Sequence, residues 1–95
     1  MNSKLQIDDR HFQIVCDILK KYPYQFYAFG SRVKNTAKKF SDLDLCYKEE
    51  IPGNIMSHIR EDFEESNLPY KVDFVDLKYC DEEFIKKIKN NLVKL

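Results

Sequence analysis

Two aspartates separated by one residue are the side chains of this sequence best suited to chemistry. Asp42 and Asp44 alternate with leucines in the run 41–48, which has the pattern of a β-strand, so both carboxylates should lie on one face. Neighbouring carboxylates raise each other's pKa, and their repulsion is relieved by a cation. Mg²⁺ takes oxygen ligands and keeps sites for water and phosphate. The spacing therefore predicts a metal site; the alternative is the solvent-facing side of an ordinary amphipathic strand.

A third carboxylate lies in a second predicted strand. Asp73 alternates with apolar residues in the run 71–77, and by itself it would be read as a surface residue. If the two strands are neighbours in one sheet, Asp73 can reach the metal held by Asp42 and Asp44. We therefore expect all three acids to be metal ligands and catalytic residues.

Gly30 and Ser31 follow an aromatic run, residues 25–29, that has the composition of a buried strand. The basic segment 32–39 comes next, and we expect one or two helical turns in it. A glycine at such a junction lets the backbone approach a ligand closely, and the amides of the following turn bind phosphate. Taken alone the pair would indicate a tight turn, but together with the acids it predicts phosphate binding.

Hydrophobic spacing predicts the elements that must position these groups. The expected class is α+β, with a mixed β-sheet of about three to four strands packed with helices. The elements follow the order α-β-α-β-α-β-α, with a helix over about 8–21, strand 25–29, short helix 32–39, strand 41–48, helix 54–66, strand 71–77 and a closing amphipathic helix 81–95.

Composition limits the classes of protein. A chain of 95 residues with 43% apolar content is expected to form one domain, residues 1–95. Its 16 basic and 16 acidic side chains cancel, so the chain as a whole does not attract a long nucleic acid. The N-terminal region is charged and lacks an unbroken apolar run, which predicts a cytoplasmic protein with no membrane contact. The three cysteines match no zinc spacing and are expected to be small buried apolar residues: Cys16, Cys46 and Cys80.

The combination of these motifs is specific. Gly30-Ser31-Arg32 followed by Ser41-Asp42-Leu43-Asp44-Leu45 resembles the signature of the DNA polymerase β nucleotidyltransferase superfamily, most closely its minimal nucleotidyltransferase (MNT) branch. The run Lys71 to Asp76 resembles the strand that carries that family's third carboxylate. Asn35 stands where the family usually has glycine, and asparagine tolerates positive φ better than most residues. The resemblance covers nearly the whole chain and implies a polymerase β palm-like fold.

The resemblance also implies a reaction. An acceptor hydroxyl would attack the α-phosphorus of ATP, and pyrophosphate would leave. Asp42, Asp44 and Asp73 would hold two Mg²⁺ ions, with Mn²⁺ as an alternative. The expected phosphate-binding residues are Gly30, Ser31, Arg32 and Ser41, with the Arg32 guanidinium facing the phosphates.

A chain this short has no room for an acceptor-binding domain, so the acceptor is expected to come with a partner. In MNT proteins of toxin-antitoxin pairs the partner is a helical HEPN-domain toxin, and the resemblance implies transfer of AMP to a tyrosine of that toxin. The alternative is a non-catalytic antitoxin that neutralises its partner by occlusion. Transfer to a small molecule is disfavoured because the chain alone offers no closed acceptor pocket. The oligomeric state and the nucleotide base stay open.

Overall fold

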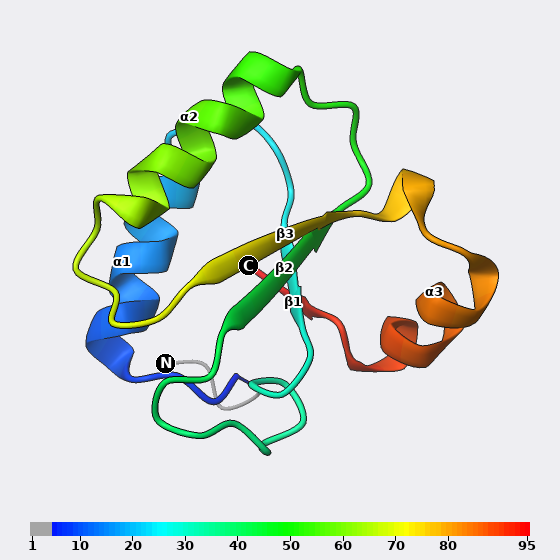
Figure 1. Ribbon diagram of the computed structural model, residues 1–95, viewed down its shortest axis with the longest axis horizontal. Helices are drawn as coiled ribbons and strands as arrows, with labels where there is room; N and C mark the ends of the chain where they lie inside the picture. The colour runs from blue at the N-terminus through cyan, green and yellow to red at the C-terminus, as the bar shows by residue number, and fades with distance from the viewer. Residues whose placement is uncertain (1–4) are drawn as a thin grey trace.

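The structure is a computed structural model that describes residues 5–95, and these residues form a four-stranded mixed sheet with helices on both faces (Figure 1). The elements in chain order are α1 (Asp9–Leu19), β1 (Tyr27–Phe29), β2 (Leu43–Tyr47), α2 (Gly53–Glu64), β3 (Val72–Asp76), the 3-10 helix η1 (Leu77–Tyr79), α3 (Glu82–Ile88), the 3-10 helix η2 (Lys89–Asn91) and β4 (Val93–Lys94).

The strands lie in the order β3-β2-β1-β4. β1 is antiparallel to both of its neighbours, whereas β2 and β3 are parallel. A parallel pair needs a crossover connection, and α2 supplies it. The predicted α+β class with a mixed sheet is therefore confirmed.

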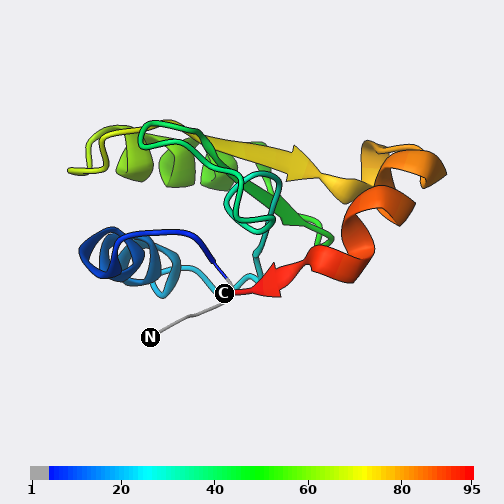
Figure 2. The same cartoon turned by 90° about the horizontal axis from the view of Figure 1, so that it is seen from below.

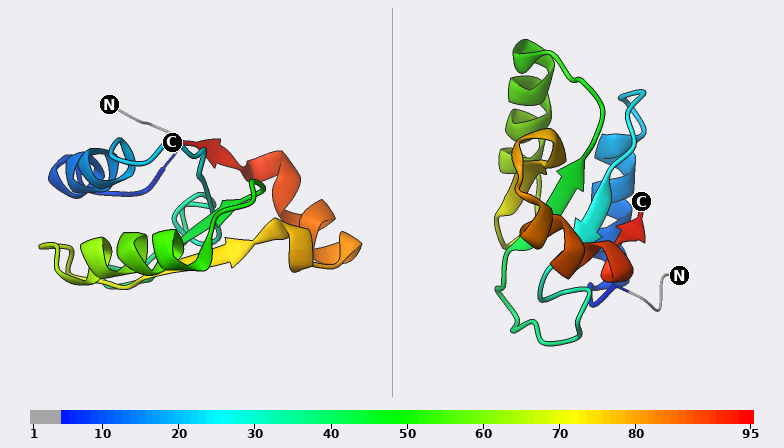
Figure 3. Two further views of the ribbon diagram at one scale, coloured as in Figure 1. Left: turned by 90° about the horizontal axis from the view of Figure 1, so that it is seen from above. Right: turned by 90° about the vertical axis from the view of Figure 1, so that its right-hand side faces the viewer.

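One face of the sheet is covered by α1 and α2, which lie on the same side of the strands in all views (Figures 2 and 3). Leu43 and Leu45 of β2 point into this layer and are fully buried, as Ile59 of α2 is. The start of α1 is set by Asp8, whose side chain accepts a hydrogen bond from the backbone N–H of Arg10. The alternating leucines of β2 therefore anchor the main core.

The opposite face is only partly covered. α3 packs over one part of it in a second apolar cluster that includes Phe29, Cys46, Leu77 and Ile88, and the other end of the face is where the aspartates of β2 and β3 lie. Asp81 begins α3 by accepting a hydrogen bond from the N–H of Phe84. The result is a sheet face that is apolar under α3 and acidic beside it.

Two of the predicted helices differ in extent or regularity from the structure, although the closing helix begins after Asp81 as predicted. The closing helix ends at Ile88, because the edge of β1 offers free backbone groups and β-branched Val93 pairs there with Ala28 in the short strand β4. The segment after Gly30 forms a turn over 31–35 and no regular helix, since Asn35 has a φ of 61°, outside the helical range.

The cysteines only partly match expectation. All three are free thiols, but only Cys46 is buried, while Cys16 and Cys80 are half-buried. None of the helices within residues 5–95 is long and apolar enough to cross a lipid bilayer.

Candidate active site

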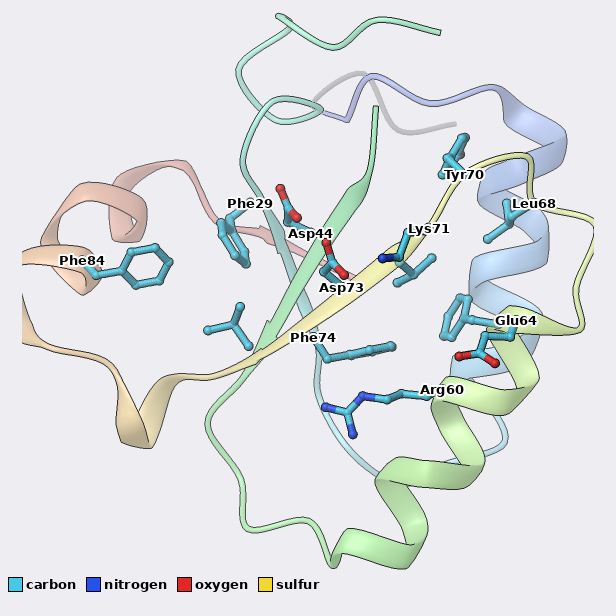
Figure 4. A pocket seen from close by; sticks show the side chains of 13 residues that line it. Phe29, Asp44, Arg60, Glu64, Leu68, Tyr70, Lys71, Asp73, Phe74 and Phe84 are labelled. Carbon is cyan, nitrogen blue, oxygen red and sulfur yellow. The ribbon is translucent and has the colours of Figure 1, made fainter. Parts of the chain in front are cut away.

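Asp44 and Asp73 lie directly opposite each other on neighbouring parallel strands. Figure 4 shows their carboxylates directed to the same side of the sheet, the side that α3 leaves open. Asp42 comes just before β2 and is exposed. The predicted pairing of the two acidic strands is confirmed, and it brings Asp73 beside Asp44.

The three acids repel one another electrostatically, and the effect is seen at Asp44. Partial burial raises the pKa of Asp44, and repulsion from Asp73 and then from Asp42 raises it further. The ionised carboxylate of Asp44 therefore lies in surroundings that disfavour negative charge. A cation beside it would remove that penalty.

The donor set fits a hard divalent cation. Among residues 5–95, no group of three His, Cys, Asp or Glu side chains lies close enough together to hold a metal ion, so the three acids do not form a closed cage. Bare carboxylates repel one another, and Mg²⁺ is commonly held by one or two carboxylates, with water and substrate phosphate completing its shell. Asp44 and Asp73 form such a pair, with Asp42 at its border.

Glycine is favoured at position 30 by its backbone conformation and by its closeness to Asp44. Its φ of +85° belongs to the left-handed region, and a Cβ at this position would collide with Oδ2 of Asp44. β1 and β2 bring the two residues together, because Phe29 is paired with Asp44 in the antiparallel register. The glycine thus lets the turn pass directly beside the carboxylate.

The turn after β1 leaves backbone donors free. The N–H groups of Val33 and Lys34 both donate to the carbonyl of Gly30, at 3.1 Å each. Those of Gly30, Ser31 and Arg32 donate to no acceptor within residues 5–95. Consecutive unpaired amides in a turn form a concavity that binds anions. The Gly30 turn, residues 30–35, therefore has N–H groups that the described protein does not use.

Asn35 completes this turn in place of the usual glycine. Its φ of 61° is the left-handed conformation that asparagine adopts most readily after glycine. The departure from the family pattern is thus accommodated by the backbone.

Arg32 does not face the phosphate turn, which corrects the role expected for it. Its side chain is buried, with 5% of its surface exposed. The guanidinium donates to the carbonyls of Gln6 (2.9 Å), Ser41 (2.7 and 3.1 Å) and Lys39 (3.4 Å), and it lies 3.9 Å from the ring centroid of Tyr70. Four of its five N–H donors bond to these carbonyls, so Arg32 holds the loops around the site.

Ser41 belongs to the same loop scaffold. Its carbonyl accepts from Arg32, and its hydroxyl accepts from the N–H of Lys38 at 2.8 Å. Both oxygens thus hold the loop that leads into β2, and a contact of the Ser41 hydroxyl with phosphate stays a prediction. No local sequence pattern connects residues 32, 41 and 70, so this scaffold could not be predicted from the sequence.

A cleft of about 800 Å³ surrounds β3 and opens on both faces of the sheet. On the acidic face its lining includes Asp44 and Asp73, and it ends at Phe29 and Phe84, whose rings meet edge to face at 5.8 Å. On the other face it runs between β3 and α2 (Figure 4). Asp44 and Asp73 therefore lie in a concave part of the surface.

Comparison with known proteins agrees with this geometry. The sequence profile described as Polymerase beta, Nucleotidyltransferase matches residues 13–95. The chain is also 40% identical over 91 residues to a protein of Haemophilus influenzae named "Probable protein adenylyltransferase MntA", and the match spans 92% of this chain and 80% of that protein.

Proposed function

Because the chain belongs to the polymerase β nucleotidyltransferase family, we propose that this nucleotidyltransferase moves AMP from ATP to a hydroxyl group on a partner protein. The observation that carries the proposal is the position of Asp44, between the open amides of the Gly30 turn on one side and Asp73 on the other. The name of the Haemophilus relative supports both AMP and a protein acceptor.

The chain's own groups divide the work. The free amides of Gly30 and Ser31 hold the terminal phosphates of ATP, which places the α-phosphorus over the carboxylates. The acceptor oxygen forms a bond to the α-phosphorus, and the bond from that phosphorus to the departing pyrophosphate breaks. Asp73 receives the proton of the acceptor hydroxyl. The reaction depends mainly on positioning and on charge compensation.

Asp44 and Asp73, with Asp42 at the border, would hold the metal. Mg²⁺ supplies a positive charge that stabilises the attacking and departing oxygens. Burial raises the pKa of Asp44, and Asp73 and Asp42 raise it further. Because each neighbouring carboxylate adds to the negative potential that attracts a cation, the chain's affinity for the ion should fall when either neighbour is neutralised. Chelation with EDTA is expected to stop transfer, and added Mg²⁺ is expected to restore it.

We further propose that the acceptor belongs to a helical HEPN-domain protein and that the pair forms a toxin-antitoxin system. In that arrangement the chain is the antitoxin, and adenylylation inactivates the partner. The cleft beside Asp73 has lining residues on both faces of the sheet, which supports an acceptor hydroxyl presented by a second protein.

The test uses ATP labelled at its α-phosphate, Mg²⁺ and the purified helical partner. Wild type is expected to label the partner, and Asp44→Asn is expected to abolish labelling while the protein stays folded. Asp17→Asn is the matched control, because Asp17 is an exposed acid on α1 and its loss should leave transfer unchanged. Equal labelling by wild type and Asp44→Asn would refute the proposed site.

A growth-rescue experiment distinguishes an antitoxin that acts as an enzyme from one that acts by occlusion alone. If adenylylation neutralises the toxin, Asp44→Asn will fail to rescue cells that express it. Rescue by Asp44→Asn with no label on the partner would instead show that binding alone neutralises the toxin.

A further inference from the structure

The site has a nucleotide side and an acceptor side, and this inference rests on the proposed function. The Gly30 turn follows β1 on one side of Asp44, whereas Asp73 stands on β3 on the other side. If the phosphates of ATP occupy the Gly30 turn, the acceptor hydroxyl must arrive across β3. The properties of β3 then decide what kind of acceptor fits.

β3 is an edge strand with an open flank. It pairs with β2 and with no other strand among residues 5–95. None of its five residues is fully buried, whereas four of the five residues of β2 are. Figure 1 shows β3 in front of the other strands with no segment drawn across it.

The open flank carries unpaired backbone groups. The N–H of Leu43 donates to the carbonyl of Lys71 at 2.9 Å. In a parallel pair, every second residue of a strand directs its N–H and C=O groups to the neighbouring strand. Odd-numbered residues of β3 therefore bond to β2, and the N–H and C=O groups of Val72 and Phe74 point outward. Neither residue makes a backbone hydrogen bond to any other part of residues 5–95 on that flank.

We propose that the acceptor protein docks by adding an extended segment to the free edge of β3 as a fifth strand. The outward groups of Val72 and Phe74 supply the hydrogen bonds, which is how strands are recognised by open sheet edges. A strand at this edge lies about 4.8 Å from β3. The residue opposite Asp73 then projects onto the acidic face, with its hydroxyl beside that carboxylate.

The cleft also predicts the neighbours of the acceptor residue. Side chains alternate along a strand, so the residues on either side of the hydroxyl project onto the opposite face. There the cleft is lined by the apolar side chains of Phe63, Leu68 and Phe74, with the charged side chains of Arg60 and Glu64 of α2 beside them. The acceptor segment should therefore carry a hydroxyl residue between two apolar residues.

Backbone methylation of a synthetic acceptor tests the docking mode without altering the protein. The probe is a short lysine-flanked peptide with one tyrosine between two valines, incubated with the wild-type chain, Mg²⁺ and ATP labelled at its α-phosphate. N-methylation removes one amide donor at a time. If the segment is parallel to β3, methylating the tyrosine amide lowers labelling about tenfold and methylating the valines does not; if it is antiparallel, the valines are sensitive and the tyrosine is not.

Hydrogen exchange gives a second readout. The amides of Val72 and Phe74 should exchange rapidly in the free protein and become protected when the unmethylated peptide is added. The amide of Ala28 is the control, since β1 is paired on both sides and its protection should not change.

The outcomes separate this inference from the function beneath it. Strand addition would be overturned if methylation at every position abolished labelling, or if methylation at no position lowered it. Labelling of the helical partner without labelling of any peptide would overturn it too. Each of these results would leave nucleotidyl transfer standing. A concentration-dependent dimer in which Val72 and Phe74 are protected without peptide would assign the edge to a second copy and also overturn it. Absence of transfer to any acceptor would remove the proposed function itself.

Discussion

Replacing Gly30 with alanine should weaken the fold and the active site through the same Cβ atom. The left-handed backbone at this position (φ +85°) costs an alanine about 1 to 2 kcal/mol. The new Cβ would also collide with Oδ2 of Asp44, and pushing that side chain off its rotamer adds about 1 kcal/mol. The free energy of unfolding should therefore fall by roughly 2 to 3 kcal/mol, which lowers Tm by on the order of 10 °C.

The assay compares this variant with a matched glycine substitution. The chain has two glycines. The second, Gly53, lies at the start of α2, and a Cβ added to it would meet no other atom within 4 Å. Gly53→Ala should therefore raise stability by about 0.4 to 1 kcal/mol and leave AMP transfer unchanged. Urea unfolding measures both effects. Transfer is measured well below the Tm of Gly30→Ala, where the folded fraction is near that of wild type.

A double-mutant cycle isolates the contact with Asp44. Combining Gly30→Ala with Asp44→Ala removes the collision but keeps the strained φ, so the two changes should couple by about 1 kcal/mol. Additive effects would mean that the carboxylate does not restrict the turn. Wild-type stability and wild-type transfer in Gly30→Ala would refute the reasoning altogether.

Three further predictions concern charge and hydrogen bonding. Because the pKa of Asp44 is raised in the folded state, its ionised form destabilises the metal-free fold as the pH rises above the ordinary pKa of 3.8. Asp44→Asn should therefore have a higher free energy of unfolding than wild type in EDTA at pH 7. In acid, where Asp44 is protonated, the free energies of unfolding of the two proteins should converge. Arg32→Lys cannot replace the fork that binds three carbonyls, so stability should fall by on the order of 3 kcal/mol; unchanged stability with weakened ATP binding would instead place Arg32 at the phosphates. Tyr22→Phe loses the 2.5 Å hydrogen bond to Asp62, which should lower the free energy of unfolding by about 1 kcal/mol. That hydrogen bond raises the pKa of Tyr22 from 10 to about 12. The difference in unfolding free energy between wild type and Tyr22→Phe should therefore be present below pH 10 and vanish as the pH rises through 12.

The sequence by itself determined the local parts of the site. Alternation in the run 41–48 correctly predicted that Asp44 and the leucines lie on opposite faces of a strand, because the period of side chains along a strand is a local property. Asp42 was expected on the same strand, but it lies just before β2. Gly30 was also recognisable, since a glycine at the end of a strand relaxes steric limits that depend only on adjacent atoms. Asn35 was likewise expected to accept a positive φ, and it does.

The tertiary structure decided which of these parts meet. Parallel pairing of β2 with β3 set Asp73 opposite Asp44, and the free edge of β1 turned the expected last helical turns into β4. Arg32 was predicted to bind phosphate, but its side chain is buried and holds loops together, because its N–H groups donate to carbonyls of residues distant in the chain. Such pairings depend on which surfaces the folded chain brings together, and hydrophobic periodicity within one segment carries no information about the segment that will lie beside it.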